Sequence, residues 1–244
     1  ELPLGDYEIA VFDNLFPSLS LEAHDAPKLS VPTEPALGAC EVVVFTQDPK
    51  TSLGNLALSH IDLLLQVWAE RYTELGLRPE INYVMPFENR GVEVGVTLHH
   101  PHGQIYAYPV VPPIPQRQLE LMESYYQKNG SGLLADMIQT EIKDGLRLVY
   151  DGPHAVAFVP ICARYPYETW IAPKRPAPSL AALTPAERRD VALALKTILR
   201  KYDLLKFLAG TEIGAGFFAA DCLPEDKAKE LRDVVVNFSA EESL

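Results

Sequence analysis

The chain has 244 residues, of which 48% are hydrophobic and 22% are charged, and its formal net charge at pH 7 is −12. This length allows a substantial core, arranged as one large domain or two of ordinary size. The acidic balance argues against a nucleic-acid-binding surface, which needs clustered Lys and Arg. No apolar run approaches the ~18 residues of a membrane-spanning helix, so we expect no nucleic acid and no membrane among the partners.

The cysteines are too few and too scattered to form a framework. Cys40, Cys162 and Cys222 include no C-x-x-C pair, which predicts neither disulfides nor a thiolate zinc site. The first residues lack the cationic and apolar segments of a secretory signal, so we expect a cytoplasmic protein. Because residue 1 is Glu rather than Met, we also expect that the full protein is longer.

Residues 1–115 predict one antiparallel sheet with a helix packed on it. A loop rich in Ser, Pro and Ala is expected over 17–39, and apolar residues recur at helical spacing from Leu56 to Leu75, with Gly76 as a stop. The pattern indicates an antiparallel meander covered on one face by an amphipathic helix. Its strands are expected at residues 7–12, 41–45, 81–87, 92–96 and 100–108.

The second half repeats this plan after a helical connector over residues 116–145. Thr184-Pro185-Ala186-Glu187 opens a long helix with a capping box and a proline at the first helical position. At an offset of 127 residues Glu41 aligns with Glu168 and Leu53 with Leu180. We therefore expect an α+β fold of two duplicated units, residues 1–115 and 146–244. Strands of the second unit are expected at residues 146–149, 154–160 and 168–172.

The duplication also predicts a gap in the second unit. About two dozen residues separate Gly76 from His100 in the first unit and complete its sheet, whereas Leu205 is followed directly by Lys206-Phe207. We expect that a segment is missing between residues 205 and 206, because the shorter sheet would keep an open edge. The alternative is a true deletion.

Three of the six histidines lie in His99-His100-Pro101-His102-Gly103-Gln104. A strand from His100 to Tyr108 would place His100, His102 and Gln104 on one face. Pro101 cannot donate to a ladder, so this strand should begin at a sheet edge or beside a loop. One imidazole could attack a phosphorus atom while a neighbour or a backbone carbonyl fixes its tautomer. Gly103 would leave room for the phosphate, and Gln104 would donate to a phosphoryl oxygen.

Two other interpretations of these histidines remain open at this point. They could be surface or core residues without a chemical role. They could also bind zinc, although no nearby cysteine or acidic residue at ligand spacing completes a set.

F-E-N-R-G at residues 87–91, followed by H-P-H-G-Q at 100–104, resembles the signature of the galactose-1-phosphate uridylyltransferase family of the histidine-triad superfamily. Related hydrolases carry H-x-H-x-H, and Gln104 at its third position is the pattern of transferases and phosphorylases. The resemblance extends to V-F-D-N at 11–14, C-E-V-V-V-F-T at 40–46, P-Y-E-T-W at 166–170 and K-F-L-A-G-T-E at 206–212.

The resemblance implies two histidine-triad-like units and a ping-pong transfer. His102 would attack the α-phosphorus of UDP-glucose, release glucose 1-phosphate and hold UMP as a phosphoramidate. Galactose 1-phosphate would then accept the uridylyl group. Gln104 would bind the phosphoryl oxygens, and His100 would help to orient the site. Members of the family are homodimers whose sites are completed across the interface, so we expect a homodimer.

The resemblance also assigns the binding residues. From the residues alone, Asn14 could equally be a turn residue, Phe87 a core residue, and Lys206 with Glu212 an exposed ion pair. By resemblance, nucleotide contacts are expected from Asn14, Phe87, Asn89, Gly95 and Thr97. Sugar-phosphate contacts are expected from Lys206, Phe207, Ala209 and Glu212.

This chain departs from the family in its metal ligands and near its end. Many members bind zinc through an N-terminal C-x-x-C, the first histidine of H-P-H and a histidine after the second strand. The cysteine pair is absent and Pro49 stands at the histidine position. We therefore expect that the chemistry needs no cofactor and that a structural zinc ion on His100 is doubtful.

After Glu212, the segment Ile213-Gly214-Ala215-Gly216 also differs, which leaves the acceptor open. One alternative is a nucleotide-sugar phosphorylase, such as an ADP-glucose phosphorylase, that uses phosphate. Another is a nucleotide-binding protein without turnover.

Overall fold

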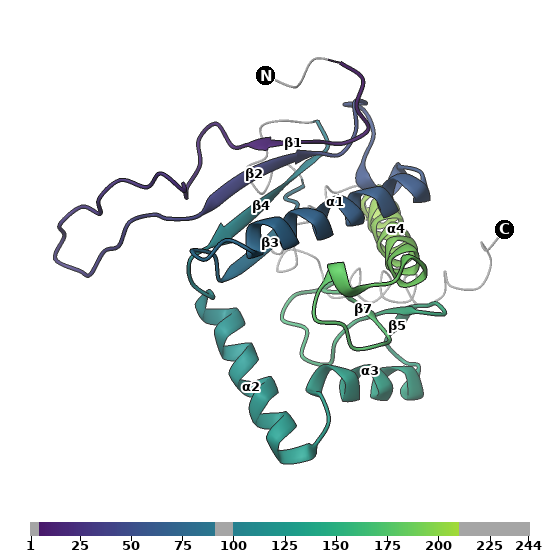
Figure 1. Ribbon diagram of the computed structural model, residues 1–244. Coiled ribbons are helices and arrows are strands. Elements are labelled where there is room, and N and C mark those ends of the chain that lie inside the picture. The colour runs from purple at the N-terminus through teal and green to yellow at the C-terminus, as the bar shows by residue number, and fades with distance from the viewer. Residues whose placement is uncertain (1–4, 91–99, 210–244) are drawn as a thin grey trace.

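The computed structural model describes residues 5–90 and 100–209, the last four of them by their backbone alone. Within these ranges the chain forms two antiparallel sheets, each with a long helix packed on it, and a pair of helices joins the two units (Figure 1). The first sheet has the strand order β1-β2-β4-β3 and the second β5-β6-β7. The predicted α+β class is confirmed.

The first sheet consists of β1 (Ala10–Asp13), β2 (Ala39–Val44), β3 (Tyr83–Phe87) and β4 (His102–Tyr108). β4 lies between β2 and β3 and pairs with both. The predicted meander is therefore wrong at this point, because β2 pairs with β4 rather than with β3. β4 is an interior strand, so of the two positions predicted for Pro101 the sheet edge is wrong, and Pro101 lies in the non-strand segment that leads into β4. The strand predicted over 92–96 lies outside the described residues.

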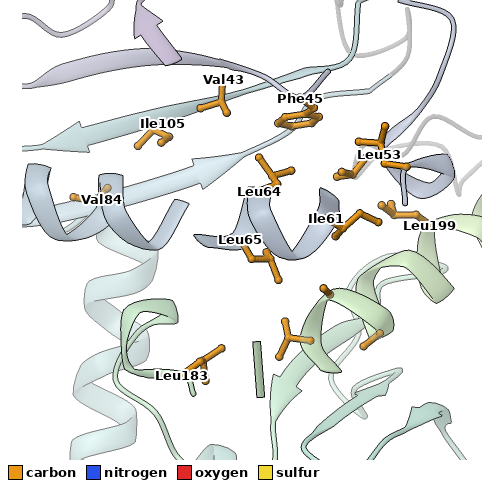
Figure 2. Close-up of a cluster of buried hydrophobic side chains, with 14 of the residues drawn as sticks. Val43, Phe45, Leu53, Ile61, Leu64, Leu65, Val84, Ile105, Leu183 and Leu199 are labelled. Carbon is orange, nitrogen blue, oxygen red and sulfur yellow. The ribbon is translucent and has the colours of Figure 1, made fainter. Parts of the chain in front are cut away.

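Helix α1 (Leu58–Gly76) covers one face of this sheet. Ile61, Leu64 and Leu65 are buried on it and form one cluster with Phe45 and Ile105 of the strand segments (Figure 2). Because side chains alternate along a strand, the residues on either side of Ile105 face away from this core. The helix continues through Gly76 to a C-cap at Leu77, one residue beyond the predicted stop.

The second unit consists of β5 (Leu148–Asp151), β6 (Ala155–Phe158), β7 (Trp170–Pro173) and α4 (Pro185–Ala209). The connector holds α2 (Pro113–Asn129) and α3 (Leu133–Asp144). No helix in the described part of the chain is both long and apolar enough to cross a membrane.

The two units start their main helices in the same register. A short 3-10 helix at Leu53–Asn55 precedes α1, and its counterpart at Leu180–Ala182 precedes α4. Both the short helices and the long helices begin 127 residues apart, which agrees with the offset seen in the sequence. α4 runs without interruption through residues 205 and 206. The missing segment at that point stays a prediction.

α1 and α4 pack against each other, so the two units share one core. Ile61 and Leu65 of α1 belong to the same buried cluster as Ala192 and Leu199 of α4 (Figure 2). Polar contacts follow the same boundary: Arg188 Nε donates to Asp62 Oδ1 at 2.9 Å. This packing fixes the position of α4 relative to the first sheet.

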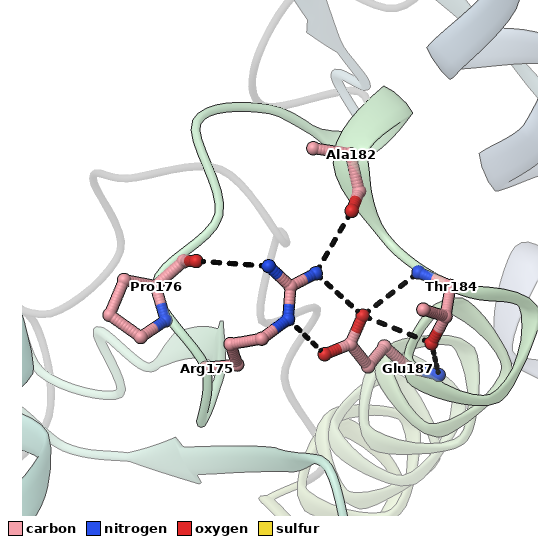
Figure 3. A network of polar contacts seen from close by, with 5 residues as sticks. All are labelled: Arg175, Pro176, Ala182, Thr184 and Glu187. Atoms are coloured by element: carbon pink, nitrogen blue, oxygen red, sulfur yellow. Dashed lines mark hydrogen bonds and ion pairs between the residues drawn. The ribbon is translucent and has the colours of Figure 1, made fainter.

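The N-terminus of α4 carries the predicted capping box. The backbone N–H of Thr184 donates to Glu187 Oε2 at 2.8 Å, and the N–H of Glu187 donates to Thr184 Oγ1 at 3.3 Å. Arg175 adds two further bonds to the same carboxylate, at 2.6 and 2.8 Å (Figure 3). The Arg175 hydrogen bonds, with a smaller contribution from the Thr184 N–H, lower the pKa of Glu187 to about 2.

This depressed pKa predicts an acid-dependent part of the stability. A carboxyl group whose pKa is ~4.3 in the unfolded chain and lower in the folded protein stabilises the fold above pH ~4.3. This contribution is lost as the pH falls towards the folded pKa. Glu187→Gln should therefore have a lower melting temperature than the unaltered protein at pH 6, and the two should converge between pH 4 and 2. Thermal unfolding followed by circular dichroism measures this.

Glu120→Gln is the matched control, because Glu120 forms an exposed pair with Arg117 on α2. It should change the melting temperature little at any pH. A difference in melting temperature between Glu187→Gln and the unaltered protein that stays constant down to pH 2 would contradict the prediction.

Candidate functional site

The histidine and glutamine of the motif lie on the face of the first sheet opposite to α1. Gly103, Ile105 and Ala107 of β4 are buried, whereas His102, Gln104 and Tyr106 between them are partly exposed. Across the sheet, Gln104 pairs with Val42 of β2 and with Phe87 of β3. The predicted alternation is confirmed from His102 onward.

His102 is held in one tautomer by the backbone. Its Nδ1 lies 2.8 Å from the carbonyl oxygen of His100. A carbonyl oxygen can only accept, so Nδ1 must carry the proton and Nε2 of the neutral ring keeps its lone pair. A ring oriented in this way can act as a nucleophile through Nε2.

His100 occupies a different environment from the one predicted. β4 begins at His102, and His100 precedes it with only 8% of its surface exposed. Its Nε2 lies 2.5 Å from the carbonyl oxygen of Thr46, to which it donates. The prediction that His100 shares a strand face with His102 is wrong, because the strand starts two residues later. His100 can orient the site through its backbone carbonyl rather than its imidazole.

Gln104 is tied to the turn that follows β1. Asn14 Nδ2 donates to Gln104 Oε1 at 3.2 Å. From the neighbouring strand β3, the ring of Phe87 meets the ring of Tyr106 edge to face, with 5.1 Å between the ring centroids. The structure therefore brings together four of the predicted residues from two strands and a turn: Asn14, Phe87, His102 and Gln104.

The remaining predicted residues fall into two groups. Asn89 is exposed and follows the end of β3. Gly95, Thr97 and Glu212 lie outside the described residues, and the side chains of Lys206, Phe207 and Ala209 at the end of α4 are not described either.

Gly103 has a different role from the one predicted. A Cβ atom at this position would lie 2.7 Å from the carbonyl oxygen of Phe87 and 2.8 Å from the Phe45 ring. Both contacts are too close, and both are on the core side of β4. The glycine is needed for the close packing of β4 on Phe45 and β3, and not to leave room for a phosphate.

An ion pair that sequence reasoning missed connects the two units beside the motif. Arg90 of F-E-N-R-G donates to Asp203 of α4 at 2.7 Å, and Ser52 Oγ donates to the same carboxylate at 3.4 Å. Burial raises the pKa of Glu88 to about 7, against the opposing effect of Arg90 and with a further increase from Asp203. Arg90 and Asp203 are 113 residues apart, so no spacing in the sequence could have paired them.

The described side chains do not gather into a metal site. Within residues 5–90 and 100–205, no three His, Cys, Asp or Glu side chains come close enough to share an ion. The expectation that the chemistry needs no metal, and that a zinc ion on His100 is doubtful, stays a prediction.

Comparison with known proteins gives one consistent family. The family models for galactose-1-phosphate uridyl transferase match residues 5–112 with their N-terminal domain and 118–235 with their C-terminal domain. A galactose-1-phosphate uridylyltransferase of Thermotoga maritima is 31% identical over 283 aligned positions, which cover 97% of this chain and 87% of that protein. This alignment is longer than the 244-residue chain, so it contains gaps.

Other relatives and a solved structure agree. A galactose-1-phosphate uridylyltransferase of Streptomyces lividans is 38% identical over 197 positions and 81% of this chain, which spans only 52% of that protein. A solved structure described as a uridylyltransferase superposes with a TM-score of 0.79 and 28% identity, covering 94% of this chain and 86% of that one.

The crowding around Gly103 predicts the effect of adding one methyl group. Gly103→Ala should lower the free energy of unfolding by about 1 to 3 kcal/mol, because the Phe87 carbonyl and the Phe45 ring must move. Urea denaturation measures the change. Gly76→Ala is the control: a Cβ there meets nothing within 4 Å, so in a helix it should add up to ~1 kcal/mol. If Gly103 only made room for a ligand, its substitution would leave stability unchanged.

Proposed function

The chain belongs to the galactose-1-phosphate uridylyltransferase family, and from this premise we propose that it transfers UMP from UDP-glucose to galactose 1-phosphate. The observation that carries the proposal is the geometry of His102, whose Nδ1 is bound to the His100 carbonyl while Nε2 keeps its lone pair. A histidine nucleophile requires this tautomer, and Gln104 stands two residues away on the same face of β4.

The proposed reaction has two steps that balance. In the first, Nε2 of His102 forms a bond to the α-phosphorus of UDP-glucose, and the bond from that phosphorus to glucose 1-phosphate breaks. In the second, a phosphate oxygen of galactose 1-phosphate attacks the same phosphorus and the N–P bond breaks, which yields UDP-galactose. No cofactor is required for either step.

The backbone contact of His102 assists both steps. As the N–P bond forms, positive charge develops on the imidazole, and the Nδ1–H bond to the His100 carbonyl becomes a stronger, charge-assisted one. Gln104 supplies an amide that can donate to the phosphoryl oxygens without taking up a proton.

The binding residues are proposed around this centre. Lys206 and its neighbours are proposed for the sugar phosphates. The ion pair between Arg90 and Asp203 supports this, because it holds F-E-N-R-G against α4 about one helical turn before Lys206. Nucleotide contacts are proposed for Phe87, Asn89, Gly95 and Thr97, whereas Asn14, expected among them from the resemblance, is proposed below to act through Gln104. Sugar-phosphate contacts are proposed for Lys206, Phe207, Ala209 and Glu212.

We further propose that the protein is a cytoplasmic homodimer. Helix α2 has no buried residue, and a second copy could cover its apolar side chains. Sedimentation equilibrium should then give twice the mass of one chain, and a monomer at micromolar concentration would contradict this proposal. The exposed apolar side chains of α2 are Ile114, Leu119, Leu121, Met122 and Tyr126.

The covalent step predicts a label on one histidine. UDP-glucose radiolabelled at the α-phosphorus should label the unaltered protein with an acid-labile, base-stable group, and His102→Gly should abolish the label because the nucleophile is gone. His24→Gly is the control, since His24 is exposed in the loop between β1 and β2 and should label normally. Undiminished labelling of His102→Gly would remove His102 as the nucleophile.

The same labelled protein identifies the acceptor. Galactose 1-phosphate should remove the label as UDP-galactose. If inorganic phosphate removes the label as UDP and galactose 1-phosphate does not remove it, the protein is a phosphorylase. A parallel experiment with ADP-glucose as the donor tests whether adenine is accepted in place of uracil. A nucleotide that binds without any exchange would favour a binding protein.

A further inference from the structure

We propose that Asn14 is a positioning residue that determines which end of the Gln104 amide faces the reacting phosphate. This inference rests on the proposed function and adds a residue that acts through Gln104. Gln104 carries a carbonyl oxygen that accepts and an amino group that donates. Only the amino end can stabilise a phosphoryl oxygen, so a free glutamine that turned by half a rotation would repel the substrate.

The backbone fixes Asn14 first. Its own N–H donates to the carbonyl oxygen of Cys40 at 2.9 Å, which holds the residue beside β2. Its side-chain Oδ1 accepts the N–H of Phe16 at 3.0 Å, a bond of the type that Asn and Asp form in turns. With Oδ1 engaged, the only part of the side chain left for Gln104 is the Nδ2 amino group.

Asn14 then fixes Gln104. An amino group can only donate, so Gln104 must present its carbonyl oxygen, and the Nδ2 to Oε1 distance is 3.2 Å. Because the amide is planar, its Nε2 amino group is left for a ligand. The turn after β1 thus sets the electrostatic character of a side chain on β4, two strands away in the sheet.

If Asn14 orients Gln104 in this way, an aspartate at position 14 should reverse the orientation of the Gln104 amide. Asn14→Asp keeps the acceptor for the Phe16 N–H, so the turn is preserved, but it places a carboxylate where the donor stood. Gln104 would then turn its amino group to the carboxylate and its carbonyl to the phosphate. Asn14→Ala removes the turn bond and leaves Gln104 free to adopt either orientation. Aspartate should therefore impair the reaction more than alanine, although it preserves the turn better.

The test is a double-mutant cycle on the single-turnover rate of His102 uridylylation. Gln104→Ala and Asn14→Asp should each slow it by roughly 100-fold, the effect of losing one donor to a developing charge, and Asn14→Ala by about 10-fold. The double variant Asn14→Asp/Gln104→Ala should match Gln104→Ala within about threefold, since Asn14 then has nothing to orient. Asn129→Asp on α2 makes the same change of charge away from the site and should react normally.

Two results would overturn the inference. One is an Asn14→Asp rate equal to or above that of Asn14→Ala in proteins with equal urea midpoints, as a purely structural turn would give. The other is a full Asn14→Asp penalty in the Gln104→Ala background, as a direct nucleotide contact would give. If the unaltered protein forms no label, the proposed function fails, and the same cycle measured on the affinity for UMP still decides whether Asn14 acts through Gln104.

Discussion

Successive side chains of β4 point to opposite faces of the sheet, one buried and the other partly exposed. The packing of the buried set determines where the partly exposed set lies. Ile105 and Ala107 are fully buried, and Gly103 lies so close to Phe45 and the Phe87 carbonyl that a methyl group would not fit. Protein cores have little free volume at such contacts, so β4 has little freedom to shift. His102 and Gln104, on the reverse side, are held in place by a core that they do not touch.

The two side chains proposed to act on the phosphate, His102 and Gln104, are then oriented by groups with a limited choice of partners. The carbonyl of His100 can only accept, which sets the tautomer of His102. The amino group of Asn14 can only donate, which sets the amide of Gln104. The first control uses a backbone carbonyl, whereas the second depends on a side chain and its turn. Both controls act before any substrate arrives, as the proposed catalytic role requires.

The described residues of the second unit fix how it sits against the first. Its helix α4 shares a core with α1, and this burial, rather than the ion pair between Arg90 and Asp203, supplies most of the adhesion, because a partly exposed pair adds only about 0 to 1 kcal/mol. The pair instead selects one register of α4 against the F-E-N-R-G segment. From Asp203 the helix continues to Ala209, over a stretch that holds three of the residues proposed for the sugar phosphate: Lys206, Phe207 and Ala209.

The sequence could predict features whose cause is local. The capping box at Thr184 and the alternation along β4 depend on neighbouring residues, and the structure has both. The offset between the two units can be read from the sequence because the same pattern occurs twice, and the helices repeat it. The insertion of β4 between β2 and β3 could not be predicted, because alternating hydrophobicity is the same for an edge and an interior strand. The purpose of Gly103 was missed for a different reason: Phe45, which crowds it, follows β2 and is far from Gly103 in the sequence. The candidate site residues His102 and Gln104 could be predicted from the motif and the alternation of a strand. The Asn14 contact that orients Gln104 comes from a distant segment and is visible only in the folded structure.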